Sequence, residues 1–382
     1  MKKLLSIVLL SVVCSISYAQ ESNNELLKKL VEKNILTQSE ADSLYQPALA
    51  KDEKIPLLQS VEKIRQGFNT PYMQFGGYGL LLYKYNDMSK IKHNLDARAL
   101  FLHMQGQLFK DFKYFVMMEF VNPTLTEFYA DWTPSSKFNL RVGQAKTPFS
   151  LENQLSLTVL ESVAYSRSVS AMTGMGDDVL KLQNGKNNFG RDMGIQAYGS
   201  FLSTRTHDIL QYGIGIYQGT GLVTSETNNS KDFTANIMIQ PIKGFRIGGG
   251  GYFGEATYIK GDDREKAKHV RNRWIISSDY KKGRLYARSE WIKANDGGIN
   301  KEGIHGMGQW YFIPEKLNGF AKIDYFNQNK EINSEVMDYT VGVNYYFFKS
   351  CRFQLNYTYS DYSSKWNAPN SNTILGQMQI VF

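Results

Sequence analysis

The chain has 382 residues, of which 42% are hydrophobic and 21% are charged, and its formal net charge is +8. This hydrophobic content excludes a disordered chain. After residue 13 no apolar run reaches the roughly 18 to 20 residues that a membrane-spanning helix needs. Glycine (32), tyrosine (24) and phenylalanine (22) are abundant, whereas there are only 2 cysteines, which excludes a disulfide scaffold. The composition favours a large protein rich in β-structure.

Residues 1–19 are predicted to be an export signal. Lys2 and Lys3 give a positive start, residues 4–13 form an apolar core, and Ser17-Tyr18-Ala19 makes a small-x-small cleavage site before Gln20. We therefore expect an exported mature chain. Cys351 is then its one cysteine, so no intrachain disulfide can form.

Residues 20–46 are predicted to form a small periplasmic helical hairpin. Leucines 26, 27 and 30 recur at helical spacing, and Thr37 with Glu40 makes a capping box that opens a second short helix. An oligomerising segment and a solvated appendage both fit its charged faces. Residues 47–70 are polar, lack a clear period and are predicted to be a linker.

From residue 71 to residue 382 the hydrophobic period is two, which predicts strands. For example, Tyr339, Val341 and Val343 alternate with Thr340 and Gly342. The sixteen expected strands are approximately 72–85, 95–109, 112–121, 125–132, 138–147, 190–202, 207–218, 232–240, 245–258, 269–280, 284–293, 304–313, 319–328, 336–348, 351–362 and 372–382.

The connections between these segments alternate between short turns and longer polar loops. Lys110-Asp111 and Lys281-Lys282-Gly283 are examples of the short turns. This alternation is typical of a closed antiparallel β-barrel that crosses a membrane, with both chain ends on one side. A soluble sandwich would also alternate, but it would not usually sustain aromatic residues at segment ends over such a length. We therefore predict an all-β transmembrane barrel of about sixteen strands.

The last segment points to a bacterial outer membrane. Ile374, Met378, Ile380 and Phe382 lie on one face of an expected strand that ends on an aromatic residue. Such an ending resembles the C-terminal recognition strand of bacterial outer-membrane barrels. Outer-membrane lipid is accordingly an expected partner.

One connection, residues 148–189, is much longer than the others, and loops of that length are usually functional or disordered. Leu151, Leu155, Leu160 and Met172 are interspersed with its polar residues, which suits a folded loop. We expect this third external loop to fold into the lumen and narrow it. The alternative is a loop that lies outside, over its neighbours.

The strand phases predict a lumen that is mixed in charge but leans basic. If Trp274 and Ile276 face outward, Arg271 and Arg273 face inward. Rings of basic residues favour anions in a pore. The residues predicted to line the pore are Arg141, Lys146, Arg167, Arg271, Arg273, Arg288, Lys322 and Arg352.

Lys146 and Arg167 are the best candidates for the constriction, because they start and occupy the long loop. Arg98 and Arg191 share the phase of apolar neighbours, so both are expected at the membrane rim. For any single basic residue, a solvated loop charge or a contact with anionic lipid is the alternative.

No enzyme, cofactor or metal is predicted. The five histidines are scattered singly, and neither HExxH nor GxSxG occurs. The glycine run at residues 248–251 lacks the GK[ST] of a phosphate loop and is interpreted as a strand bend. The basic pI of about 9.1 does not indicate nucleic acid in an exported chain.

A family resemblance is visible in three stretches. The sequence Arg141-Val142-Gly143-Gln144-Ala145-Lys146-Thr147-Pro148-Phe149-Ser150 precedes Glu161-Ser162 and Arg167-Ser168, and Gly190-Arg191-Asp192-Met193-Gly194 follows. Together they resemble the phosphate-selective porin O and P family, over the whole barrel from about residue 70. The resemblance implies a sixteen-stranded homotrimeric outer-membrane porin with a basic lumen and an inward third loop.

The function that these expectations define is passive diffusion of small anions, with phosphate or polyphosphate as the solutes that the family name implies. The alternative within the same class is a general diffusion porin without selectivity. A barrel enzyme and a structural barrel whose lumen is plugged remain as alternatives from other classes.

Overall fold

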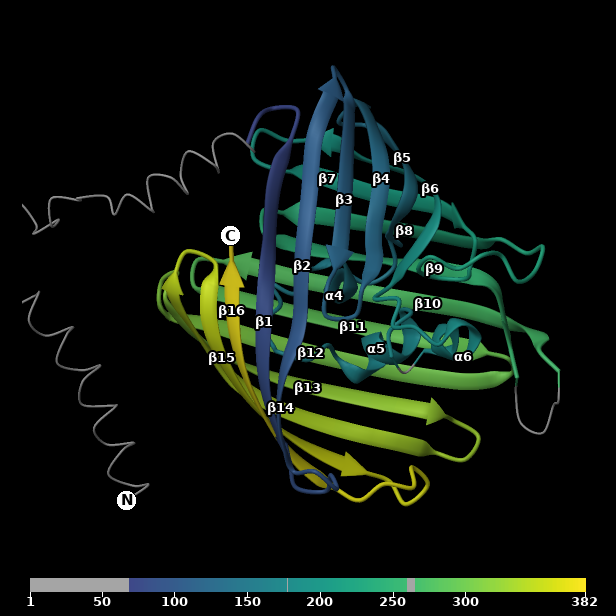
Figure 1. Cartoon of the computed structure of the whole chain (residues 1–382), viewed down its shortest axis with the longest axis vertical. Coiled ribbons are helices and arrows are strands. Elements are labelled where there is room, and N and C mark those ends of the chain that lie inside the picture. The colour runs from purple at the N-terminus through teal and green to yellow at the C-terminus, as the bar shows by residue number, and fades with distance from the viewer. Residues whose placement is uncertain (1–68, 177, 260–264) are drawn as a thin grey trace, which may run out of the picture. The chain divides into compact units, whose positions relative to one another are not determined.

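The computed structural model describes residues 69–176, 178–259 and 265–382, and in these residues sixteen strands form one closed antiparallel barrel (Figure 1). The predicted fold class is therefore confirmed. The strands are β1 (Gln74–Asn86), β2 (His93–Phe109), β3 (Phe112–Glu119), β4 (Thr124–Ser135), β5 (Phe138–Lys146), β6 (Arg191–Ser203), β7 (Asp208–Tyr217), β8 (Asp232–Ile242), β9 (Phe245–Tyr258), β10 (Ala267–Lys282), β11 (Leu285–Asp296), β12 (Ile299–Ile313), β13 (Leu317–Asn329), β14 (Ser334–Phe348), β15 (Cys351–Tyr362) and β16 (Ser371–Val381).

Each strand pairs with its neighbours in sequence, and the barrel closes where β1 pairs with β16. This closing ladder runs from Tyr78 opposite Val381 to Asn86 opposite Thr373. Closure leaves no free sheet edge, so the backbone polar groups of the strands are satisfied within the protein. A segment surrounded by lipid requires this.

The two faces of the strands differ as the period of two predicts. On β15, Phe353, Leu355 and Tyr357 are exposed on the outer face, whereas Arg352 and Asn356 on the inner face are buried. Apolar side chains of this kind cover the outer face of the other strands as well, which suits contact with acyl chains.

The hairpin between β11 and β12 differs from the sequence expectation. The polar residues 294–303 were expected to form a loop, but the two strands stay paired up to Asp296 opposite Ile299. Gly297 and Gly298 make the connection, both with positive φ. Two glycines can adopt the left-handed conformations of a tight hairpin turn at no steric cost, and for this reason the polar run continues the ladder.

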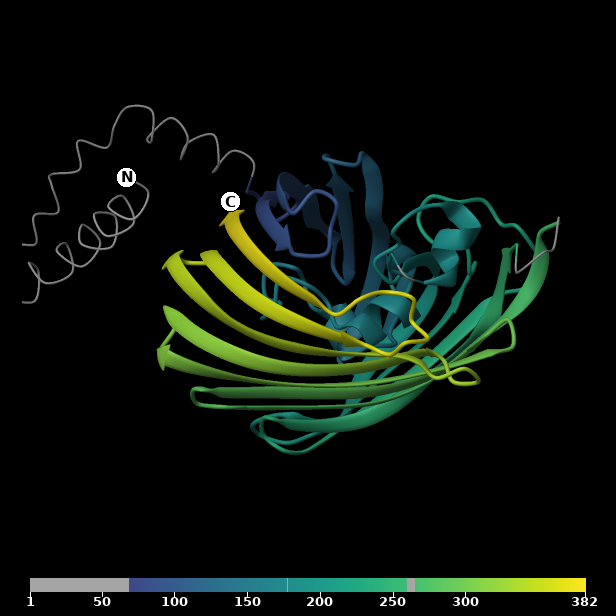
Figure 2. The ribbon, with the colours of Figure 1, turned by 90° about the horizontal axis from the view of Figure 1, so that it is seen from below.

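The long connection between β5 and β6 folds inside the barrel, as predicted. It contains three short helices, α4 (Leu151–Gln154), α5 (Arg167–Met172) and α6 (Val179–Asn184). Figures 1 and 2 show these helices on the concave side of the strands. We call residues 147–190 the inner loop.

The inner loop packs against the wall through an apolar cluster. Its residues Phe149, Val169 and Met172 belong to one buried cluster with Ile275 of β10 and Ile292 of β11. Ile275 and Ile292 point inward, so the inner face here is not lined by polar residues alone. Burying them removes apolar surface from the water-filled lumen and holds the loop in place.

The structure does not describe residues 1–68, so the predicted signal at 1–19, the hairpin at 20–46 and nearly all of the linker at 47–70 lie outside the described residues. Within the described ranges, no helix is long and apolar enough to cross a membrane.

Candidate pore and the inner loop that divides it

One half of the inner loop is bound to β14, β15 and β16 by side chains that hold its backbone. Arg352 donates from Nη2 to the carbonyl oxygens of Leu157 (3.2 Å) and Leu160 (2.8 Å). The backbone N–H of Val163 donates to Asn356 Oδ1 at 2.6 Å. Gln379 donates to the carbonyl of Thr158, and Gln354 and Asn344 donate to that of Glu161. The wall thus satisfies loop carbonyls that lack partners within the loop.

The start of α6 is held by two arginines of β10. Arg273 binds Asp178 at 2.5 Å and Asp296 at 2.9 Å, and Arg271 binds Asp232 at 3.3 Å and Asp178 at 3.6 Å. All five side chains are buried. Burial would raise the pKa of the Asp178 carboxyl, but Arg273 and Arg271 outweigh burial and hold the pKa well below its usual range. Asp178 therefore stays ionised and attached to the wall at neutral pH.

A second buried group holds the middle of the inner loop. Arg288 of β11 binds Glu161 at 2.9 Å and Glu152 at 3.4 Å. Lys322 of β13 donates to Ser162 Oγ and to the carbonyl of Ala164, both at 3.2 Å. Both cations also act on the carboxylate of Glu152.

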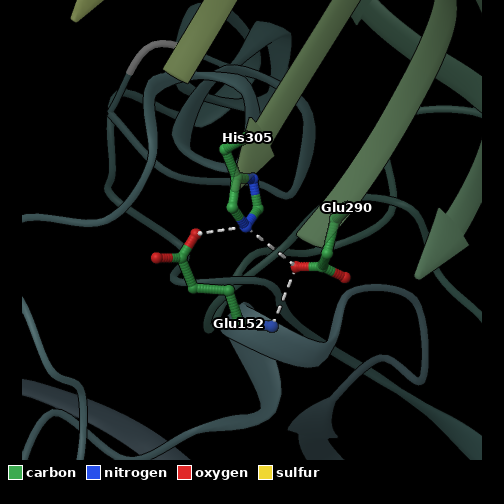
Figure 3. A group of neighbouring side chains, drawn as sticks. All are labelled: Glu152, Glu290 and His305. Atoms are coloured by element: carbon green, nitrogen blue, oxygen red, sulfur yellow. Dashed lines mark hydrogen bonds and ion pairs between the residues drawn. The ribbon is translucent and has the colours of Figure 1, made fainter. Parts of the chain in front are cut away.

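Beside this group, Glu290 of β11 receives the start of α4. Its carboxylate accepts from Ser150 Oγ (2.8 Å), from the backbone N–H of Leu151 (2.7 Å) and from that of Glu152 (3.0 Å). An acidic group at the start of a helix satisfies N–H groups that have no partner within the helix. His305 of β12 lies next to the carboxylates of Glu152 and Glu290 (Figure 3).

The two residues predicted for the constriction have partners. Lys146 donates from Nζ to the carbonyl oxygens of Asn153 (2.6 Å) and Leu155 (2.7 Å). Arg167 forms an ion pair with Asp338 at 2.9 Å, and about a quarter (26%) of its side chain is exposed. Lys146 therefore ties down the loop, whereas Arg167 keeps part of its side chain exposed and lines a cavity.

Three cavities surround the inner loop. A cavity of about 400 Å³ lies between the loop and β1, β2 and β13–β16, and we call it the loop-side chamber. A cavity of about 790 Å³ near the short turns is called the turn-side chamber. A third cavity of about 410 Å³ adjoins the turn-side chamber, because both are lined by Leu155, Gln211 and Arg246.

The inner loop separates the two chambers. Ser162 and Val163 line the loop-side chamber, Val159 and Glu161 line the turn-side chamber, and the two chambers share no lining residue. The short segment 157–163, held by Arg352 and its neighbours, therefore lies between them.

The eight residues predicted to line the pore divide into two sets. Arg141, Arg167 and Lys322 line cavities, and Lys322 also binds the inner loop. The others are bound to the inner loop or to its acidic neighbours and line none of the three cavities: Lys146, Arg271, Arg273, Arg288 and Arg352. The strand phase thus indicated which way these side chains point, but it did not distinguish the two roles.

The expectation that Arg98 lies at the membrane rim is wrong. Leu80 pairs with Ala99 and Leu81 pairs with Ala97, so Arg98 is an extra residue at a β-bulge. A bulge changes which way the side chain points. Arg98 lines the loop-side chamber and donates to the carbonyl of Val163 (2.9 Å) and to Gln377 Oε1 (2.6 Å). Arg191 is also buried, and it forms an ion pair with Glu127 at 2.6 Å.

Besides Arg98, the sequence reasoning missed four basic residues that line the chambers, among them Lys281 and Lys349 of the turn-side chamber. Lys84 lines the loop-side chamber, and Arg246 lines the turn-side chamber and its neighbour. Lys84 alternates with Tyr83 and Tyr85, and this alternation is a signal that it points inward. Arg246 is the second residue of β9 and follows a turn closely, so too few alternating residues precede it to indicate which way its side chain points.

The closed barrel of sixteen strands with an inward loop defines an outer-membrane porin fold. A model of the family described as "Phosphate-selective porin O and P" matches residues 77–382. The chain belongs to this family, and the protein is a porin of the bacterial outer membrane. Among curated protein sequences, no relative matches the chain.

Solved structures support the same fold at low sequence identity. An anion-selective porin from Comamonas acidovorans has a TM-score of 0.62 at 11% identity, covering 81% of this chain and 99% of that porin. The trimer form of OmpT from Vibrio cholerae has a TM-score of 0.57 at 11% identity, with 81% and 100% covered. The outer-membrane channel DcaP of Acinetobacter baumannii has a TM-score of 0.56 at 11% identity, with 81% and 97% covered.

Proposed function

We propose that this porin gives passive diffusion of small anions across the outer membrane, with phosphate and polyphosphate as the favoured solutes. The observation that carries the proposal is the lining of the loop-side chamber. Its basic residues are Lys84, Arg98, Arg167 and Lys322, and its acidic residues are Asp324 and Asp338. Basic residues exceed acidic ones by two where a solute would wait before passing the segment 157–163.

The basic residues of this chamber attract anions, and each attraction is of moderate strength. A unit charge about 4 Å away is worth about 1 kcal/mol in bulk water and about 4 kcal/mol at an effective dielectric constant near 20. Several such groups concentrate anions without holding them, and conduction requires release as well as entry. The proposal makes the protein a channel and not an enzyme.

The comparisons support two further parts of the proposal. The family description names phosphate selectivity, and the Comamonas acidovorans protein is described as anion-selective. One of the similar structures is a trimer form, so a homotrimer is proposed for this chain too. We also propose that residues 1–19 are a signal that is removed on export, and that 20–46 form a periplasmic hairpin.

A specific observation favours a second function. Because the inner loop contacts the wall from β8 to β16 and separates the chambers, a plugged barrel with a structural role also fits the geometry. A general diffusion porin requires the same loop to leave an unselective path.

Recording from single channels in planar bilayers under a salt gradient separates these functions. We expect a reversal potential that favours anions, together with block of the chloride current by added phosphate. Conductance without selectivity would support the general porin. Absence of conductance from correctly folded protein would support the plugged barrel and overturn the proposal.

The helical hairpin has its own test. Deleting residues 23–45 is expected to lower the yield of trimers if this segment assists assembly. An unchanged trimer yield would make the segment dispensable.

A further inference from the structure

Three buried side chains from different parts of the chain meet behind the inner loop. They are Glu152 of α4, Glu290 of β11 and His305 of β12 (Figure 3). One ligand atom from each lies within 4.8 Å of the other two. The exposed fraction of each residue is at most 1%. The group joins the loop to two adjacent strands of the wall.

The separations in this group are longer than hydrogen bonds and close to those of metal ligands. His305 Nε2 lies 3.6 Å from Glu152 Oε2 and 3.8 Å from Glu290 Oε2. An N–H···O hydrogen bond is shorter than this, at about 2.7–3.2 Å. Two ligands bound at about 2.0–2.2 Å to one tetrahedral zinc ion lie roughly 3.3–3.6 Å apart.

The ring of His305 is oriented so that Nε2 points at the carboxylates of Glu152 and Glu290. Ser168 Oγ lies 3.4 Å from Nδ1 and donates to Asp324 Oδ1 at 3.1 Å. Because the serine proton is used on Asp324, its oxygen faces Nδ1 as a distant acceptor, which leaves Nε2 to carry a proton or to bind a metal ion. Nε2 has no hydrogen-bond partner among the described residues.

A bare nitrogen facing two carboxylates is unfavourable unless something positive lies between them. A metal-ligating histidine usually donates its other ring N–H to a fixed acceptor, and here the chain from Nδ1 through Ser168 to Asp324 supplies one. The arrangement of the second nitrogen therefore fits a metal ligand.

The charges around the group point the same way. Four buried carboxylates surround it, namely Glu152, Glu161, Glu290 and Asp324. The buried cations that face them are Arg288 and Lys322. Arg167 is left out of this charge count, because its positive charge is balanced by the ion pair with Asp338. The excess is two negative charges, and a burial of unbalanced charge is costly. A divalent cation removes this excess, whereas a proton on His305 removes only half of it.

We propose that Glu152, Glu290 and His305 bind one divalent transition-metal ion of the zinc type, and that the ion fastens the inner loop to β11 and β12. One nitrogen and two carboxylate oxygens are ligands that zinc accepts. Glu290 is already oriented by the N–H groups of Leu151 and Glu152 and by Ser277 Oγ. Binding requires the hydroxyl proton of Ser150 to turn away from Glu290 Oε2, to which it now donates.

The site is tested on the barrel protein purified from outer membranes in detergent. The protein is stripped with EDTA, dialysed against micromolar zinc chloride, and its zinc content is measured per chain by mass spectrometry. We expect about one zinc per chain in the wild type. Protease cleavage within residues 147–190 should slow when zinc is added, since the ion holds the loop.

The variants make the assignment specific. His305→Gln and the loop variant Glu152→Gln should lose the zinc, whereas His207→Gln, on the exposed turn before β7, should keep it. Ser168→Ala should weaken binding roughly tenfold, since it removes an outer partner of the histidine. Resistance of the folded barrel to dissociation in SDS shows whether each variant has folded.

Two results would overturn the site. One is a wild-type protein that retains no zinc, which would mean that a proton on His305 bridges the carboxylates. The other is equal zinc binding by wild type and by folded Glu152→Gln and His305→Gln. Neither result bears on anion selectivity, which the bilayer recordings test separately.

Discussion

Two sets of basic residues point into the same lumen and behave differently. Arg271, Arg273 and Arg288 are at most 3% exposed, and each binds acidic groups. Arg141 and Arg167 also form ion pairs, with Asp131 and Asp338, but they keep 22% and 26% of their side chains exposed and line cavities. We call the first set the anchoring arginines and the second set the chamber-lining arginines. Exposure to the lumen, rather than position on the inner face, decides which role an arginine has.

The two roles differ because the two sets of arginines differ in how much water surrounds their charges. A charge taken out of water must be compensated by a partner, and its field is then cancelled at short range. A charge that stays partly in water keeps some field for a passing ion, at a strength that salt reduces. The anchoring arginines are thus expected to control the position of the loop, and the chamber-lining arginines the preference for anions.

The largest effect is expected from Arg273→Ala. This change leaves Asp178 and Asp296 buried without their partner, and breaking a buried pair costs about 3–5 kcal/mol. We expect the inner loop to detach, single-channel conductance to rise and protease to cut within residues 147–190. Arg284→Ala, at an exposed turn position, is the matched control. Unchanged conductance and cleavage would show that the loop does not depend on this anchor.

Low pH should weaken the same anchor. The folded state holds the pKa of Asp178 below its usual value of about 4. Its contribution to loop attachment is therefore complete above about pH 4 and is lost as the pH falls below that value towards the folded pKa. We expect conductance at pH 3 to rise relative to pH 7 in the wild type and to change less in Arg273→Ala. Equal pH responses of the two proteins would rule out Asp178 as the group responsible.

Much of this fold could be predicted from the sequence, because lipid imposes a strict alternation. Trp274 and Ile276 face outward and Arg273 inward, as the period of two requires. The bulge at Arg98 shifts the inward and outward alternation of β2 by one residue. No glycine or proline at this position signals the bulge in the sequence, so the shift could not be predicted. The partners of the anchoring arginines were also out of reach, because Asp178 lies 95 residues from Arg273 and contacts it only once the loop has folded.

Gly303→Ala is expected to have an intermediate effect on the loop. A Cβ at Gly303 of β12 would lie 2.4 Å from the Cβ of Ser168, so α5 would have to move. Overpacking of this kind costs typically about 1–3 kcal/mol. Faster protease cleavage of the inner loop would reveal it. Gly306→Ala, on the outer face of the same strand, meets nothing within 4 Å and should leave cleavage unchanged.

The smallest effect is expected from Lys84→Glu, which changes a chamber-lining charge without touching an anchor. Lys84 is exposed in the loop-side chamber, and in water a charge at about 4 Å contributes about 1 kcal/mol. The ratio of anion to cation permeability should therefore fall, with conductance and loop cleavage unchanged. Arg167→Glu together with Lys146→Glu should shift the reversal potential further towards cations and also loosen the loop, because Lys146 holds two of its carbonyl groups. If Lys84→Glu instead changes loop cleavage and leaves the reversal potential as it was, the division between anchoring and chamber-lining residues does not describe this porin.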